Sequence, residues 1–289
     1  MLDNTAAVDP RVECLSGPRC EFGESPFFDS RDGSVVYVDT TGTIIQRRPS
    51  GETTSWPVGE SISFAIPAAS GGYVVGLARG LCRFDPAEGS ISPMNLASAG
   101  GPRCNDATVD SMGRVIFGTK ATGREAFDGE MVVVDGAGQR IVARGFGLVN
   151  GLAVDAEAGL LFVADTHPEV QSVWRYRYDS STGTLGDREK IFDFHSRRGR
   201  PDGATVDASG NLWIAEIGGH ALVCLSANGV VIREIALPIS MPTKPCFDGG
   251  SRMLVTTASL GVDLKVEPAA GHLLATEVPG ASFTAIAAV

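Results

Sequence analysis

Several features that mark common protein classes are missing from this sequence of 289 residues. No run of about 18 apolar residues occurs, so no segment is long enough to span a membrane as a helix. The stretch from Met1 to Val12 has neither a basic nor an apolar segment, and no signal peptide is visible. The six cysteines form no C-x-x-C pair. We therefore expect reduced thiols and a cytoplasmic location.

Motifs of several well-known catalytic classes are absent too. The chain has no G-x-S-x-G nucleophile elbow, no G-x-x-x-x-G-K-[ST] phosphate loop and no H-E-x-x-H zinc helix. Its four histidines show no spacing that is typical of metal ligands. Cys104 and Cys246 have no histidine close in sequence, which disfavours a catalytic thiol.

Basic residues are fewer than acidic ones, with 24 Lys and Arg against 34 Asp and Glu and a net charge of −10 at pH 7. Nucleic acids and anionic membranes would repel such a chain, so we exclude both as partners and expect a small-molecule ligand. Gly and Pro number 36 and 16, which is typical of many short strands joined by turns. Because repeats reach both ends of the chain, we expect a single domain over residues 1–289.

Self-similar segments recur through the chain at a period of about 40 to 50 residues, which indicates a repeat architecture. Each begins with a polar residue that leads into a short apolar strand: Glu24–Asp29, Ser63–Ala68, Asn105–Asp110, Asn150–Asp155, Asp202–Asp207 and Thr243–Asp248. A glycine-containing turn and a second strand follow each one, and usually a third and a fourth. The sequence therefore predicts an all-β fold, a six-bladed β-propeller with four-stranded antiparallel blades.

Two further segments have predicted places in this ring. The segment Arg11–Leu15 is expected to supply the outermost strand of the last blade, which closes the ring and hides a strand edge. The stretch Glu189–Arg200 is predicted to be the longest connection between strands, either as a loop over the site or as a packed surface loop.

Residues at one register of a repeat occupy equivalent places, so the first residues of the six segments are expected to face a common axis. Glu24 and Asp202 bring two carboxylates there, and Asn105 and Asn150 bring two carboxamides. Such oxygen-rich sets bind hard divalent cations. The alternative, a wet channel that needs polar lining, explains the serine and threonine of the set well. It explains the acidic pair poorly, because like charges crowded together are costly without a cation. Of the two carboxamides, Asn105 is the weaker ligand candidate.

Cationic side chains lie close to these axial positions in sequence. Arg103 and Arg200 precede the axial residues of their repeats by two positions, and Lys244 directly follows one. At the mouth of the channel they are expected to bind a polyhydroxy or carboxylate-bearing ligand. The alternative for Arg200 and Lys244 is that they neutralise a local acidic surface. Asp106 and Asp165 are expected to orient other ligands through hydrogen bonds.

The same residues carry a resemblance to a known family. Five segments resemble the senescence-marker-protein/gluconolactonase family of sugar lactonases, and most closely its xylonolactonase-like bacterial members: Phe22–Pro26, Arg103–Asp106, Val149–Gly151, Arg200–Gly203 and Pro242–Phe247. The likeness covers residues 13–260 and keeps the family's order and spacing of motifs. It implies a six-bladed propeller with one catalytic divalent metal. The implied metal ligands are Glu24, Asn150 and Asp202, and the implied substrate-binding residues are Arg103 and Asn105.

This chain departs from the family pattern in places that concern the substrate. Ala107 stands where many members have glycine, and a substrate-contacting glutamate of some relatives falls near Gly123, with Glu125 as a stand-in. The segment after Leu260 is shortened and divergent. The resemblance therefore leaves open which lactone is bound.

The function implied is metal-dependent hydrolysis of a sugar-acid lactone to the open-chain acid. Asp202 is the expected catalytic residue, because a carboxylate ligand of the metal also lies within reach of the water whose proton must be accepted. The cofactor is one divalent cation, with Ca²⁺, Zn²⁺, Mn²⁺, Mg²⁺ and Fe²⁺ all compatible. Two alternatives remain open: hydrolysis of aryl esters or phosphotriesters on the same scaffold, and a non-enzymatic propeller with a structural cation. The sequence does not indicate the oligomeric state.

Overall fold

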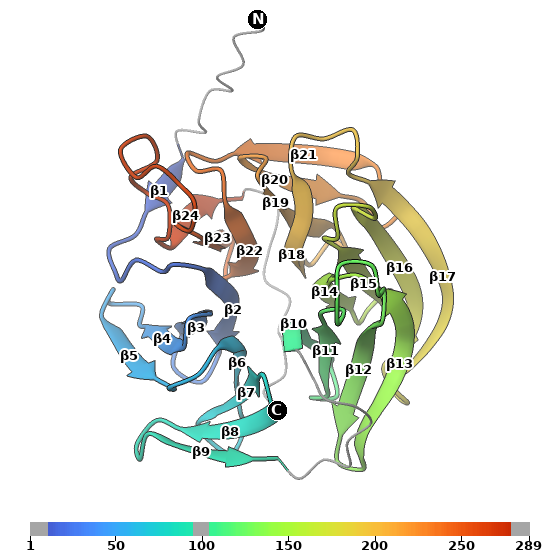
Figure 1. The fold of residues 1–289 in the computed structure, drawn as a ribbon, viewed down its shortest axis with the longest axis horizontal. Helices are drawn as coiled ribbons and strands as arrows, with labels where there is room; N and C mark the ends of the chain where they lie inside the picture. The colour runs from blue at the N-terminus through green and yellow to red at the C-terminus, as the bar shows by residue number, and fades with distance from the viewer. Residues whose placement is uncertain (1–10, 95–103, 279–289) are drawn as a thin grey trace, which may run out of the picture.

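The computed structural model describes residues 11–94 and 104–278. The regular elements in this part of the chain are β-strands, and they form six four-stranded antiparallel sheets around a common axis (Figure 1). The predicted all-β, six-bladed β-propeller is thereby confirmed. Within these residues no helix is both long and apolar enough to cross a membrane.

Each blade runs from an inner strand at the axis to an outer strand at the rim (Figure 1). The first two blades contain β2 (Gly23–Asp29), β3 (Ser34–Asp39), β4 (Thr43–Arg47) and β5 (Thr53–Pro57), then β6 (Ile62–Pro67), β7 (Tyr73–Leu77), β8 (Gly80–Asp85) and β9 (Ser90–Pro93). The next two contain β10 (Cys104–Val109), β11 (Val115–Thr119), β12 (Gly129–Asp135) and β13 (Gly138–Phe146), then β14 (Val149–Asp155), β15 (Leu160–Asp165), β16 (Ser172–Asp179) and β17 (Thr184–Asp193). The last two contain β18 (Arg200–Val206), β19 (Leu212–Ile217), β20 (Ala221–Leu225) and β21 (Val231–Ala236), then β22 (Pro242–Phe247), β23 (Arg252–Thr257), β24 (Leu274–Glu277) and β1 (Val12–Cys14).

The ring closes between the two ends of the described chain. Strand β1 pairs antiparallel with β24, with Val12 opposite Thr276 and Cys14 opposite Leu274, and Figure 1 shows the two side by side. The sixth blade is thus completed by an N-terminal strand, as the sequence predicted. This pairing covers the edge of β24, which would otherwise present unpaired backbone groups.

The six predicted repeat starts form the innermost strands β2, β6, β10, β14, β18 and β22. Their inner edges have no neighbouring strand in the sheet, so a residue without a backbone N–H is tolerated there. Pro26, Pro201 and Pro245 all lie in these strands, as expected for edge strands. The prolines and the polar starts therefore lie on the same strand edges, which face the axis.

The core lies between neighbouring blades. Phe27 of β2, Phe64 of β6 and Phe117 of β11 are buried in one cluster that spans the first three blades. Gly76 makes room for it, because a Cβ atom there would lie 2.4 Å from the ring of Phe64. Truncating a buried phenylalanine to alanine typically costs about 3–5 kcal/mol. Packing between blades therefore holds the inner strands, and with them the axial residues, in place.

The prediction for Glu189–Arg200 was wrong. Strand β17 continues to Asp193, so only residues 194–199 connect it to β18. Phe194 is fully buried there, and Arg197 forms salt bridges with Glu216 and Glu234. Among the connections described in full, the longest instead joins β23 to β24 through residues 258–273.

Candidate metal centre

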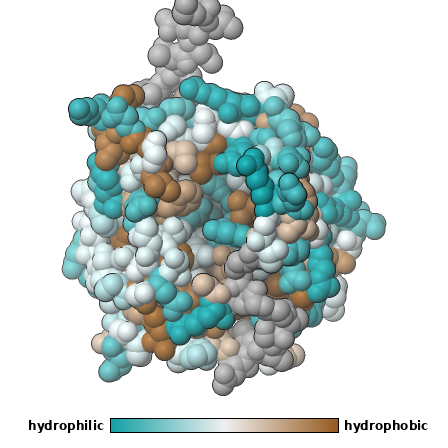
Figure 2. Space-filling view, viewed as in Figure 1, coloured by the Kyte–Doolittle hydropathy of each residue, from teal (hydrophilic) through white to brown (hydrophobic). Residues whose placement is uncertain are grey.

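A cavity of about 400 Å³ lies at the end of the axis where the inner strands begin. The starts of five inner strands line it, with Glu24, Ser63, Asn105, Asn150 and Asp202. A second group of lining residues lies at or just beyond the ends of the second strands: Thr40, Lys120, Thr166 and Ile217. The face in Figure 2 is largely hydrophilic, with hydrophobic residues in small separate patches. The cavity thus gathers polar side chains from five blades.

Each inner strand is irregular at the register of its axial residue. The pairing of inner and second strands shifts at Glu24/Phe27, Ile62/Phe64, Cys104/Ala107, Asn150/Ala153, Pro201/Ala204 and Pro242/Lys244. Such bulges redirect side chains and bend the strand. Ser25, directly after Glu24, has a φ of 48°, which for a residue other than glycine costs about 1–3 kcal/mol. Packing between the blades holds this strained backbone beside the cavity.

Glu24 and Asp202 form an acidic pair at the axis. Asp202 is buried, while Glu24 is partly exposed and accepts a hydrogen bond from the Ser25 N–H at 2.8 Å. Burial, and after it the charge of Asp106, raises the pKa of Glu24 to about 7, although the charge of Lys244 opposes the rise. Burial also raises the pKa of Asp202 well above its usual range, with the charge of Glu24 as the next cause. The nearby cations Lys244, Lys120 and Arg200 therefore do not offset the burial and mutual repulsion of the pair.

Asn150 is held next to Asp202 by its own hydrogen bonds. Its Nδ2 donates to Asp202 Oδ1 and, at 3.1 Å, to the Thr166 hydroxyl. That hydroxyl donates in turn to the carbonyl of Pro201 at 2.7 Å. The Oδ1 atom of Asn150 accepts only a long 3.3 Å bond from the Gly151 N–H. Its amide oxygen is consequently available as a ligand.

These residues fit a divalent cation. Within the described part of the chain, no three His, Cys, Asp or Glu side chains come together as a metal-binding group, so a site here needs oxygen donors of another kind besides carboxylates. Glu24, Asn150 and Asp202 together supply two carboxylates and one carboxamide, the oxygen donors that hard cations take. A bound cation would also offset the repulsion that raises both carboxyl pKa values.

The other predicted residues of the axial register lie as follows. Asn105 lines the cavity and donates from Nδ2 to the carbonyl of Val149 at 2.9 Å. Ser63 lines it too, but its hydroxyl donates to the carbonyl of Cys104 at 2.6 Å. Thr243 is fully buried and donates to the carbonyl of Gly23 at 2.6 Å. Arg103, a predicted substrate-binding residue, lies outside the described residues.

Of the predicted cations at the mouth, one is correctly placed and one is not. Arg200 lines the cavity, and its Nη1 donates to the carbonyl of Thr166 at 3.3 Å. Lys244 does not lie at the mouth: it is 4% exposed and binds Asp106 inside the ring. The residue that directly follows the axial one is buried in other blades too, as at Ser25 and Phe64, and Lys244 takes the same inward position. Glu125 is exposed and does not line the cavity.

Asp165 organises the backbone around the cavity and does not contact Asn150. Its carboxylate accepts hydrogen bonds from the N–H groups of Gly147 at 2.7 Å and Leu148 at 2.9 Å. Asp39 does the same for Glu21 and Phe22 in the first blade. Carboxylates at the ends of second strands thus fix the segments that lead into the inner strands.

Lys120 and Thr166 are cavity residues that the sequence reasoning missed. Each follows directly after the last residue of a second strand, Thr119 or Asp165. The same repeat alignment, applied one strand further out, would have found both. The signal was present, but only the first strand of each repeat was used.

The thiols next to the axial register are poor nucleophiles. Burial raises the pKa of Cys104 to about 12, and burial also raises the pKa of Cys246 above its usual range. A thiolate, the reactive form, is therefore scarce at neutral pH. His167 has a structural role, because its Nε2 contacts the carbonyl of Arg124 at 2.8 Å and its ring packs on Phe127.

We expect the metal-free protein to lose part of its stability as the pH rises from about 4.5 to about 7, the usual and the raised pKa of Glu24. In this window the folded state binds more protons than the unfolded chain, so the free energy of unfolding falls with rising pH. Thermal melts of chelated wild type and Glu24→Gln at pH 5 and 7.5 measure the effect. The wild type should lose more stability than the variant, and an equal loss in both would contradict the pKa assignment.

Comparison with known proteins agrees with this geometry. The family described as SMP-30/Gluconolactonase/LRE-like region matches residues 22–259. Regucalcin of Danio rerio is 30% identical over 278 residues, which cover 90% of this chain and 92% of that protein. The 6-deoxy-6-sulfogluconolactonase of Pseudomonas putida is 30% identical over 283 residues, or 94% and 96%.

A solved structure shows the same fold. The crystal structure of regucalcin from Agrobacterium tumefaciens, described as a calcium-binding protein, matches with a TM-score of 0.86 at 22% identity and covers 96% of each chain. The family match itself extends over well more than half of the present sequence. The chain therefore belongs to the SMP-30/gluconolactonase/LRE-like family.

Proposed function

We propose that this protein hydrolyses a sugar-acid lactone to the open-chain acid, with one divalent cation bound by Glu24, Asn150 and Asp202. The convergence of two carboxylates and one free amide oxygen on a single cavity carries the proposal. Family membership and the lactonase among the relatives support it. The finer likeness to xylonolactonases stays a prediction from the sequence motifs.

When bound, the divalent cation supplies Lewis acidity that polarises the lactone carbonyl. Asp202 accepts the proton of the attacking water in this mechanism. As a carboxylate at the cation, Asp202 lies within reach of a water that binds there. Asn150 holds Asp202 through its amide N–H, so the base keeps one orientation.

The wall of the cavity has the two kinds of surface that a sugar lactone needs. Asn105, Lys120 and Arg200 provide polar groups for ring oxygens and hydroxyls, whereas Met241 and Leu260 provide apolar surface. The volume of about 400 Å³ is in the usual range of small-molecule sites. The apolar surface also suits an aryl ester, so that substrate class is the second candidate.

Several divalent metals are compatible with these oxygen donors. Ca²⁺, Mg²⁺ and Mn²⁺ prefer oxygen ligands, and Zn²⁺ and Fe²⁺ also accept carboxylates. One of the relatives is described as calcium-binding, which makes Ca²⁺ the first cation to test.

A substrate panel tests the proposed reaction. Metal-free protein is supplied with each divalent cation in turn, and hydrolysis of aldonolactones, aryl esters and phosphotriesters is followed by pH-stat titration. The proposal predicts the highest kcat/KM on aldonolactones. A clear preference for aryl esters or phosphotriesters would favour the second candidate, and no hydrolysis with any cation would favour a structural metal.

We expect Asn105→Ala to raise KM about tenfold, because losing one or two hydrogen bonds to the substrate costs about 1–1.5 kcal/mol. Ser63→Ala is the matched control from the same register of the repeat. The Ser63 hydroxyl has already used its one hydrogen on a carbonyl, so its removal should change KM little, whereas Asn105 has a second N–H and an amide oxygen besides its bond to Val149. Equal KM values for Asn105→Ala and the wild type would remove Asn105 from substrate binding.

A further inference from the structure

Lys244 crosses the interior of the ring beneath the cavity. It belongs to the sixth blade, yet its Nζ donates to Asp106 Oδ1 at 2.5 Å and to the carbonyl of Ala107 at 2.7 Å, both in the third blade. Lys244 and Asp106 are 4% and 1% exposed. Asp106 also accepts the Leu152 N–H of the fourth blade at 2.8 Å. One buried ion pair therefore connects three blades.

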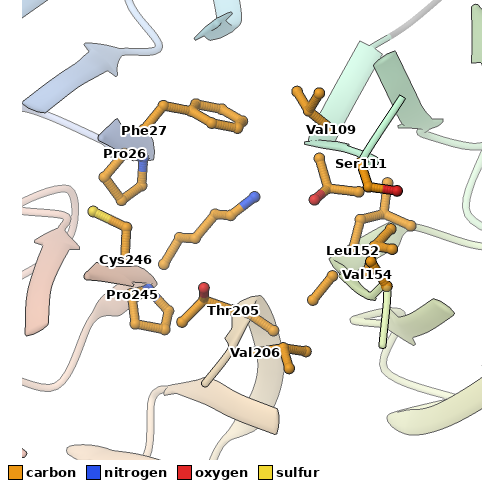
Figure 3. Close-up of a pocket in the computed structure, with 15 residues that line it drawn as sticks. Pro26, Phe27, Val109, Ser111, Leu152, Val154, Thr205, Val206, Pro245 and Cys246 are labelled. Carbon is orange, nitrogen blue, oxygen red and sulfur yellow. The ribbon is translucent and has the colours of Figure 1, made fainter. Parts of the chain in front are cut away.

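The surroundings of Lys244 are shaped to receive it. A Cβ atom at Gly203 would lie 2.4 Å from Lys244 Cβ, so glycine is required for its path past the fifth blade. Nζ lies 5.4 Å from the centroid of the Phe27 ring. Lys244 lines a small inner cavity of about 50 Å³ and not the larger one that holds Glu24 and Asp202. Figure 3 shows Phe27, Leu152 and Pro245 around this inner cavity.

The axial groups have an uneven charge balance. Glu24, Asp106 and Asp202 contribute three negative charges when ionised, and Lys244 contributes one positive charge that favours ionisation of Glu24. Two negative charges remain, which is what one divalent cation neutralises. Lys120 is exposed and Arg200 is partly exposed, so solvent screens their charges, although Arg200 also favours ionisation of Asp202.

We infer that Lys244 is the buried, fixed counter-charge of the axial site and shifts its selectivity from trivalent toward divalent cations. The inference rests on the proposed metal site and concerns how this chain tunes it. Removing the ammonium leaves three carboxylates, whose field attracts a trivalent ion more than a divalent one. Removing Asp106 as well restores the original balance. If Lys244 acted only through packing, removing Asp106 as well would not restore the metal selectivity of the wild type.

The test is the ratio of the La³⁺ and Ca²⁺ association constants, measured by titration calorimetry on the whole protein. Lys244→Met should raise this ratio, on the order of tenfold if one unit charge acts over about 10 Å at an effective dielectric constant of about 20. Asp106→Asn should lower it, and the double variant should return to the wild-type ratio. Lys120→Met, which removes a screened ammonium at the cavity, is the matched control and should change the ratio less than Lys244→Met.

The variants also cover the case in which Lys244→Met does not fold, because Asp106→Asn and the double variant still give the predicted order. A ratio that stays constant across the folded variants would overturn the inference while leaving the metal site intact. A double variant no closer to the wild type than Lys244→Met would do the same. Absence of any divalent binding to the wild type would overturn the metal site itself.

Discussion

Replacing Asp202 by asparagine is expected to abolish metal-dependent turnover and, at the same time, to raise the melting temperature of the metal-free protein. The first effect follows because the variant loses a charged ligand and the proposed base, and kcat should fall by about 10³-fold or more for a residue that combines two such roles. The second follows because a buried carboxylate beside Glu24 is costly without a cation. Asparagine keeps the size of the side chain and the Oδ1 acceptor for Asn150.

The control is Asp207→Asn in the same strand and turn region. Asp207 accepts hydrogen bonds from Trp213 Nε1 at 2.9 Å and from the Asn211 N–H at 3.0 Å. Weakening these bonds should lower the melting temperature while catalysis persists. The two variants should therefore move stability in opposite directions. A metal-free Asp202→Asn protein that melts below the wild type, or that still hydrolyses lactones, would contradict the role assigned to Asp202.

Removing divalent ions is expected to abolish hydrolysis and to lower the melting temperature. A ligand that binds only the folded state stabilises it by about 2.7 kcal/mol at a hundred times its Kd. For a chain of this size each kcal/mol corresponds to about 2–4 °C. Scanning calorimetry of chelated protein, before and after addition of Ca²⁺ or Mn²⁺, measures the shift.

Glu24→Gln is the matched control for chelation. It weakens the ligand set, so the added cation should raise its melting temperature less than that of the wild type. A chelated wild type that keeps both its activity and its melting temperature would exclude a functional cation. A sample that loses stability but never hydrolyses any lactone would support a structural one.

The sequence predicted the parts of the fold that depend on the repeat. Six polar strand starts were enough to identify the inner strands, and the strand around Val12 was correctly placed beside the last blade. The alignment also brought Glu24, Asn150 and Asp202 to one cavity. These successes share a cause: each repeat of the sequence forms one blade, so residues at the same position of the repeat occupy equivalent places around the axis.

The main failure concerns the residue that directly follows an axial position. Alternation along a regular strand places Thr243 and Lys244 on opposite faces, and the sequence reasoning assigned the axial role to Thr243. The bulge at Pro242/Lys244 instead leaves Thr243 buried and Lys244 reaching across the ring to Asp106. The same bulge recurs in all six inner strands, but a bulge has no clear signature in a single sequence, so the inward position of the following residue was not predicted. The ion pair joins residues 138 positions apart in the chain, which no local pattern reveals.

The most direct measurement is an anomalous difference map from crystals of the wild type grown with Mn²⁺, compared with crystals of Asp202→Asn grown in the same way. We predict one strong peak in the wild type, within ligand distance of a carboxylate oxygen of Glu24, Asn150 Oδ1 and a carboxylate oxygen of Asp202, and a much weaker one in the variant. A wild-type map with no peak at the axis, or with its peak away from these three side chains, would contradict the proposed metal centre.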